Sequence, residues 1–291
     1  MSATWLLGIY LFMFNIFDIV TQYCVDKRND VFLKYMEKRG WHKETFEQWE
    51  LGYFPQAEIL NLKVRAKSNN IAIEDLEDSH ILKKKRGLKA HDSIFYGRII
   101  FPIKNEFGKR IAITGRTLLQ DEKPKYYNTD FEKGNHLYGL NFAIEHIRRQ
   151  KIVYVFEGNA DVVTAHQYGI KNTVCVMGTS FRDDHLVLLS GYAKNIVLIF
   201  DNDTGGKGAL ASFNSKNIEN KRVNGVEIFR CSLKDYVKNK HKDVDEFLSI
   251  SGRDEFINFV DRSIKDDKIQ KRLREIKKDK KVAIYGKKVH V

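Results

Sequence analysis

The sequence predicts an α/β fold built on a parallel sheet with helices on both faces, preceded by a smaller, basic, mixed α+β domain. Three apolar runs rich in β-branched and aromatic residues carry this prediction, at residues 152–156, 173–177 and 196–200. Each has the length and composition of a buried parallel strand and ends on a polar or glycine-containing turn. Repeated strand and helix units of this kind are typical of doubly wound sheets.

Carboxylates follow two of these runs directly. Glu157 comes after the first run, and Asp201 and Asp203 come after the third. Because ligands bind beyond the carboxyl ends of the strands in such sheets, we expect the three side chains to converge on one crevice. Carboxylates held that close repel each other unless a hard cation sits between them. Mg²⁺ is the natural candidate, since it takes oxygen ligands and keeps waters and substrate phosphates in its shell.

A second acidic pair, Asp243 and Asp245, follows one more strand-like run at 226–230 and supplies further candidate ligands. Taken alone, any one of these carboxylates is more readily explained as a helix N-cap or a solvated loop residue. The glycine-rich turn at 204–208 does not make a Walker motif, because Asp201 stands where that motif needs glycine and Gly208 where it needs Ser or Thr.

In order and spacing, these acidic and glycine motifs resemble the TOPRIM domain of DnaG-type DNA primases. The matching pieces are Glu157-Gly158 with Asp161, Gly178-Thr179-Ser180, Asp201-x-Asp203-x-x-Gly206 and Asp243-x-Asp245. The resemblance implies that Glu157, Asp201 and Asp203 are catalytic, with Glu157 either a metal ligand or a proton-transfer group. It also implies that Asp161, Asp243 and Asp245 complete the metal-binding set. The expected metal is Mg²⁺, with Mn²⁺ as an alternative, and no zinc is predicted.

The composition of the chain favours a polyanionic partner. The 291 residues carry a formal net charge of +12, which is typical of proteins that bind nucleic acid. The three cysteines, Cys24, Cys175 and Cys231, have no spacing that would make a metal site or a disulfide framework, which suits a reducing cytoplasm. We expect a helical segment at 1–30, a basic subdomain at 31–150, the metal-binding domain at 151–250, and a helical, basic tail at 251–291.

The N-terminal segment Trp5–Val20 is apolar but is interrupted by Asn15 and Asp18, and it is shorter than a membrane span requires. We interpret it as a helix that docks on the core, with membrane association as the less favoured alternative. Asn29 or Asp30 is then expected to cap a helix that ends at Gly40. A second helix is expected around Thr45–Trp49, with further helix between residues 56 and 90.

Short strands begin at Arg98. The pattern predicts a hairpin of residues 98–103 and 110–114 around a turn that ends in Gly108. The blocks from 98 to 140 resemble the basic half of the primase core. That resemblance implies that Arg98, Arg116, Lys125 and Lys133 line a groove beside the metal crevice, with Asn128 near the nucleotide. Tyr126, Tyr127 and Tyr138 offer stacking faces, although aromatic residues in strands are more often part of the core.

The function implied is that of a DNA primase catalytic core, which synthesises short RNA primers on single-stranded DNA with ribonucleoside triphosphates during replication. The alternatives are a TOPRIM nuclease or topoisomerase that cleaves DNA strands, and a catalytically idle nucleic-acid-binding accessory of the replisome. The sequence shows no Cys/His cluster for the zinc ribbon typical of the bacterial family, so either a separate zinc-ribbon protein selects the template or initiation is less sequence-selective. A replicative helicase is a further expected partner. The expected location is the cytoplasm of a bacterium or of a phage-infected host.

Overall fold

The structure, a computed structural model, describes residues 15–55, 58–85, 90–178, 180–200, 225–236 and 241–286, with side chains through residue 269. The chain divides into two compact units, residues 1–132 and residues 133–291. This boundary falls earlier than the one expected after residue 150. Residues 133–150 belong to the second unit because Leu140, Ala143 and Ile147 are packed in its hydrophobic core.

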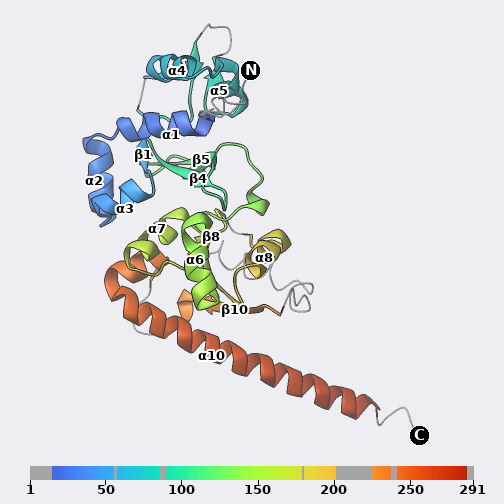
Figure 1. The fold of residues 1–291 in the computed structure, drawn as a ribbon. Helices are drawn as coiled ribbons and strands as arrows, with labels where there is room; N and C mark the ends of the chain where they lie inside the picture. The colour runs from blue at the N-terminus through green and yellow to red at the C-terminus, as the bar shows by residue number, and fades with distance from the viewer. Residues whose placement is uncertain are drawn as a thin grey trace, which may run out of the picture. The chain divides into compact units, whose positions relative to one another are not determined.

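The first unit combines short helices with an antiparallel sheet (Figure 1). The strand order of this sheet is β1-β4-β5-β6. A separate two-stranded sheet joins β2 and β3. The elements are α1 (Ile16–Asp26), α2 (Asp30–Lys38), α3 (Lys43–Gln48), β1 (Gly52–Tyr53), α4 (Ile59–Ser68), α5 (Ile73–Asp78), β2 (Lys83–Lys84), β3 (His91–Asp92), β4 (Arg98–Lys104), β5 (Arg110–Thr117) and β6 (Tyr126–Asn128).

Helix α1 docks on the core of this unit, as the sequence predicted for the part of the segment that the structure describes. Its residues Val20, Tyr23 and Cys24 are buried in one cluster with Phe54 and Ile100. The preceding residues through 14 lie outside the described residues. None of the helices in the described part of the chain has both the length and the apolar character needed to cross a bilayer.

Local signals set the ends of the next elements. The side chain of Asn29 accepts a hydrogen bond from the Phe32 amide at 3.1 Å, so Asn29 is the cap of α2. In the hairpin of β4 and β5, the Asn105 side chain accepts from the amides of Phe107 and Lys109. Gly108 has a φ of 83° there, a conformation that glycine adopts without a steric penalty. The predicted hairpin is therefore present.

The second unit is built on a parallel sheet of strand order β10-β9-β7-β8. From α6 to β9 its helices and strands alternate along the chain, as the sequence predicted. The elements are the 3-10 helix η2 (Lys133–Asn135), α6 (Leu140–Gln150), β7 (Ile152–Phe156), α7 (Asn159–Gln167), β8 (Thr173–Cys175), α8 (Asp183–Ser190), β9 (Asn195–Phe200), β10 (Glu227–Ser232), the 3-10 helix η3 (Leu233–Asp235) and α10 (Val244–Gly286).

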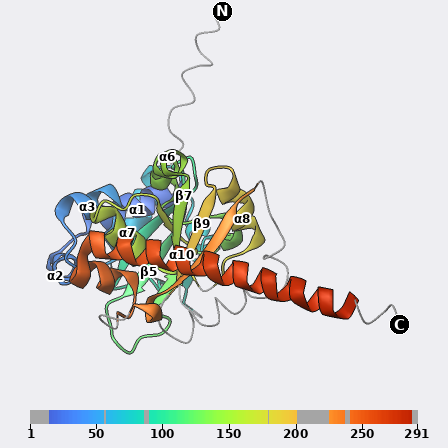
Figure 2. The same ribbon diagram turned by 90° about the horizontal axis from the view of Figure 1, so that it is seen from below.

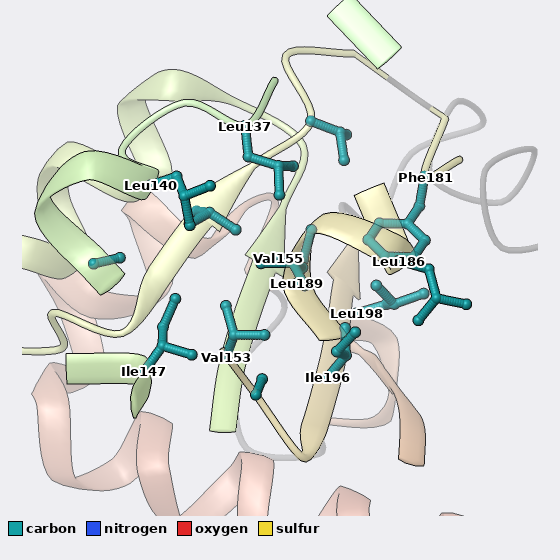
Figure 3. Close-up of a cluster of buried hydrophobic side chains, with 14 of the residues drawn as sticks. Leu137, Leu140, Ile147, Val153, Val155, Phe181, Leu186, Leu189, Ile196 and Leu198 are labelled. Atoms are coloured by element: carbon teal, nitrogen blue, oxygen red, sulfur yellow. The ribbon is translucent and has the colours of Figure 1, made fainter. Parts of the chain in front are cut away.

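Helices cover both faces of this sheet. On one face, α6 and α8 pack against the side chains of β7 and β9 that point toward them, including Val153, Val155 and Leu198 (Figure 3). On the other face, the ring of Phe156 meets Phe256 of α10 with centroids 6.3 Å apart. Figure 2 shows α10 running across the sheet in front of β7 and β9. Successive side chains of β7 thus serve opposite faces, as the pleat requires.

Buried polar contacts tie α10 to α7. The amide of Asp245, in the first turn of α10, donates to Oδ1 of Asp161 in the first turn of α7 at 3.0 Å. The hydroxyl of Thr164 donates to Oδ1 of Asp245. Both aspartates are buried. Because a buried carboxylate is costly without donors around it, these contacts fix where α10 begins relative to α7.

We expect Thr164→Val to destabilise the protein, because it leaves the buried Asp245 carboxylate with one donor fewer at almost unchanged volume. The loss should be about 1–3 kcal/mol in the free energy of unfolding. Urea denaturation of the full chain would measure it. Thr164→Ser, which keeps the hydroxyl, is the matched control and should retain most of the stability. Equal stability of the Val variant and the parent chain would contradict a stabilising role for the hydrogen bond from Thr164 to Asp245.

Helix α7 also carries a buried histidine, His166. Nε2 of His166 donates to the Thr173 carbonyl at 3.3 Å, and burial lowers the pKa of His166 to about 4. The folded protein therefore holds His166 neutral at a pH where the unfolded chain, with an ordinary pKa of about 6.5, already binds a proton. The stability contributed by the neutral form is complete above about pH 6.5 and is lost as the pH falls toward 4.

Replacing His166 with Gln should flatten this dependence on pH, since glutamine does not titrate. Between pH 7 and pH 5 the parent chain should lose roughly 2 kcal/mol more of its unfolding free energy than the variant does. Urea denaturation at both pH values would show the difference. His42→Gln, at an exposed position, serves as the control and should follow the parent chain. Parallel curves for all three proteins would refute the role of His166.

Candidate metal centre and nucleic-acid-binding residues

Glu157 lies where the sequence predicted, at the carboxyl end of β7. Its side chain is half-buried, and its backbone carbonyl accepts a hydrogen bond from the Gly178 amide at 3.2 Å. That bond joins the turn after β7 to the turn after β8. At Gly158, an added Cβ would lie only 2.8 Å from Oδ2 of Asp161. A side chain at position 158 would therefore force the Asp161 carboxylate to move.

The strand register places the predicted ligands at one edge of the sheet. In the parallel pairing of β7 and β9, Val155 lies opposite Leu198. Two residues beyond that pair, the first strand reaches Glu157 and the second reaches Phe200. Asp201 follows Phe200 directly in the sequence. Asp201 and Asp203 themselves lie outside the described residues.

The remaining acidic residues make structural contacts, of which the helix cap is the kind that the sequence allowed and the buried contacts are new. Asp243 caps α10, since its Oδ1 accepts from the Glu246 amide at 2.9 Å. Asp161 and Asp245 are 5% and 8% exposed and belong to the buried contacts between α7 and α10. Because those contacts join the first turns of the two helices, Glu157 and Asp243 each lie just before one of two neighbouring helix starts.

The residues at this edge suit a hard divalent cation, since Glu157 and Asp243 both carry carboxylates and are partly exposed. Within the residues that the structure describes, no three His, Cys, Asp or Glu side chains gather as a metal cluster. The predicted centre therefore depends on the contribution of Asp201 and Asp203.

Three of the predicted nucleic-acid-binding residues lie on or beside β5 and β6. Lys125 is exposed, and Asn128 is half-buried on β6. Arg116 on β5 donates from Nη1 to the Tyr126 hydroxyl at 2.9 Å. Its guanidinium carbon lies 5.4 Å from the ring centroids of both Tyr126 and Tyr35. Arg116 is thus held between two aromatic rings while it remains partly exposed.

Sequence reasoning missed the other half of this stack. Arg39 lies over Tyr35 at 5.5 Å and over Trp41 at 5.6 Å, and its Nε donates to the Tyr35 hydroxyl at 3.0 Å. Together with Arg116 it forms an alternating series of guanidinium groups and rings. The short spacing of Tyr35, Arg39 and Trp41 hints at local contact, but only folding brings β5 to α2.

The prediction that Arg98 lines a groove is wrong. Arg98 is 1% exposed, and its guanidinium is engaged by backbone carbonyls and by Glu122. A guanidinium can be buried in this way because its five donors match the surrounding acceptors. The prediction came from the resemblance of residues 98–140 to the basic half of the primase core, whereas in the structure the segment 115–125 folds over Arg98.

The predicted tyrosines are packed against the cores of their units. Tyr127 meets Phe95 at 5.5 Å between ring centroids, and Tyr126 meets Phe101 at 6.3 Å. Tyr138 is 1% exposed. The expectation that these tyrosines belong to the core is thus confirmed for Tyr138. Burial raises the pKa of the Tyr126 hydroxyl. Lys133 lies in η2, where burial lowers the pKa of its ammonium group and its carbonyl accepts from Nε2 of His185 at 3.0 Å.

Two family models match the chain. Residues 20–144 match the N-terminal domain of the DNA primase catalytic core, and residues 154–248 match a Toprim-like domain. Domains of the Toprim type generally bind a divalent metal, which agrees with the acidic edge of the sheet. The first match continues past the division of the molecule after residue 132, and the break between the matches lies beside the boundary that the sequence predicted after residue 150.

Individual proteins give the same result. The DNA primase of Clostridium acetobutylicum is 34% identical over 79% of this chain, which spans only 37% of that relative. The E. coli primase catalytic core superposes with a TM-score of 0.73 at 26% identity, over 86% of this chain and 79% of the other. A DnaG primase catalytic domain bound to ssDNA gives a TM-score of 0.73 at 25% identity, over 87% and 81% of the two chains. In sequence, in domain order and in fold, the chain belongs to the catalytic cores of the DnaG-type DNA primases.

Proposed function

We propose that this chain synthesises RNA primers on single-stranded DNA by metal-dependent nucleotidyl transfer. The observation that carries the proposal is the position of Glu157, at the carboxyl end of a central parallel strand and level with the end of β9, after which Asp201 and Asp203 follow. Polymerase chemistry needs clustered carboxylates at one site, and the order of motifs matches that of the primase cores.

Mg²⁺ is the proposed metal, with Mn²⁺ as an alternative, and Glu157, Asp201, Asp203 and Asp243 are its proposed holders. When bound, divalent ions at such a site lower the pKa of an attacking hydroxyl and neutralise charge on a leaving pyrophosphate. Glu157 is a ligand or takes the proton of the attacking 3′-hydroxyl. Asp161 and Asp245 act by holding the two helix starts in place, since their carboxylates are already engaged with donors from the protein.

The proposed substrates are a single-stranded DNA template and ribonucleoside triphosphates, both of which are anionic. Support comes from the net charge of +12 and from the similar DnaG domain, which is described as bound to ssDNA. Arg116, Lys125 and Lys133 are the proposed phosphate contacts, with Asn128 near the nucleotide. A guanidinium held between two rings loses little conformational freedom when it binds a phosphate, which favours Arg116 most.

Strand cleavage and idle binding are the competing functions, and one assay separates them. The purified chain is incubated with single-stranded DNA, a supercoiled plasmid, Mg²⁺ and labelled ribonucleotides. Short RNA products are the expected result. Nicked plasmid without RNA would show that the chain cleaves DNA strands and does not synthesise primers. Binding of DNA without either product would show that the chain is an accessory protein. Addition of a replicative helicase or a zinc-ribbon protein, both proposed partners, then tests whether primer synthesis rises.

Asp201→Asn and Asp203→Asn should each remove nearly all primer synthesis without unfolding the protein, because each replaces a charged ligand by a neutral amide of equal size. Glu157→Gln should have the same effect. Primer yield and thermal unfolding are measured together. Asp184→Asn, an exposed acid on α8, is the control for the loss of one charge and should stay active. If either Asp201→Asn or Asp203→Asn kept most of its activity, the assignment of ligands would fail.

A further inference from the structure

Arg98 is the most completely engaged guanidinium described in the first unit. It donates to the carbonyl of Ile94 at 2.7 Å and to Oε1 of Glu122 at 2.5 Å. From Nη1 it also reaches three carbonyls in the chain that follows β4, namely those of Gly115 at 3.3 Å, Pro124 at 3.1 Å and Lys125 at 3.4 Å. These last three acceptors lie at the two ends of the segment 115–125.

The same segment is closed by further contacts. The second carboxylate oxygen of Glu122 accepts from the Thr117 hydroxyl, and the Thr117 amide donates to the Lys125 carbonyl at 3.0 Å. At Gly115 an added Cβ would lie 3.1 Å from Cδ of Arg98 and 2.6 Å from a ring carbon of Phe95. The backbone therefore passes directly over Arg98, and the ion pair lies inside the loop that the segment makes.

Two of the proposed phosphate contacts, Arg116 and Lys125, stand at the ends of this segment. We propose that the ion pair of Arg98 and Glu122 is a positioning device, which sets the spacing of Arg116 and Lys125 for an anionic nucleic-acid backbone without touching it. The proposal rests on the proposed function, because it takes single-stranded nucleic acid as the ligand of those two residues.

Direct contact between Arg98 and phosphate is the competing explanation, and the structure disfavours it. The side chain is 1% exposed, and its donors already have acceptors. Reaching a phosphate would break these bonds and leave buried carbonyls without a donor. Glu122 separates the two explanations, because a carboxylate repels phosphate. If Arg98 bound phosphate itself, removing Glu122 would release it and strengthen binding. If the pair positions its neighbours, removing Glu122 weakens binding.

The test is the affinity of the full chain for a fluorescein-labelled single-stranded oligodeoxynucleotide, measured by anisotropy at one fixed salt concentration. We expect Arg98→Lys and Glu122→Ala each to weaken binding by about three- to tenfold. The Glu122 side chain is 34% exposed, so this variant should fold even if the Arg98 variant does not. Unchanged or tighter binding by Glu122→Ala overturns the proposal.

A double-variant cycle tests whether Arg98 acts through its neighbour. Lys125→Ala should weaken binding, and Arg98→Lys combined with Lys125→Ala should weaken it by less than the product of the two separate effects. Independent residues would give the full product, which would overturn the positioning role.

Two control variants address charge and stability. Asp121→Ala removes an exposed acid next to Glu122 but outside this set of bonds, and should leave affinity unchanged or slightly higher. Arg110→Lys disturbs another arginine of the same sheet, which bridges Asp18 and Glu50 at 2.7 Å each, and should lower stability without changing affinity. Equal weakening by Arg110→Lys would overturn the proposal. A parent chain that binds no oligonucleotide would instead refute the proposed function itself.

Discussion

The pairing of β7 with β9 is the constraint on which the rest of the proposed centre depends. Because the two strands are parallel and adjacent, their carboxyl ends lie at one edge of the sheet, with Glu157 level with the last residue of β9. An antiparallel pair would carry these ends to opposite edges. Apolar packing holds the arrangement, since Val153, Val155 and Leu198 are fully buried beneath α6 and α8. The position of the Glu157 carboxylate is therefore set by the packing of a hydrophobic core.

Buried polar contacts then fix the positions of helix starts and loop segments more closely than strand pairing alone does. In the second unit, Asp161 and Thr164 of α7 both bond Asp245 of α10, which joins the helix starts beside Glu157 and Asp243. In the first unit, Arg98 and Glu122 close the segment between Arg116 and Lys125. Such groups are stabilising only when all their partners are in place, and for that reason they fix geometry more sharply than apolar contacts do.

The two units carry charged residues of opposite sign at their proposed functional surfaces. Acidic residues dominate the described edge of the parallel sheet, whereas exposed or partly exposed cations stand along β5 and β6. Arg116 contacts the rings of Tyr35 and Tyr126, and no carboxylate among the residues that the structure describes forms an ion pair with it. An arginine whose charge is not neutralised by a neighbouring acid remains available to an anionic ligand. Arg116 and Arg98 differ in this respect, because Arg98 is paired with Glu122, although both residues look alike in the sequence.

The sequence by itself determined the elements and their order. The runs at 152–156 and 196–200, the hairpin ending in Gly108 and the cap at Asn29 all depend on neighbours along the chain, so local patterns predict them. The tertiary structure alone decided how polar side chains are used. It buried Arg98 under residues 115–125, joined Asp161 to the start of α10 and placed residues 133–150 in the second unit. The reason is physical: periodicity reports which face of an element is apolar, whereas the partner of a polar group comes from distant parts of the chain that meet only on folding.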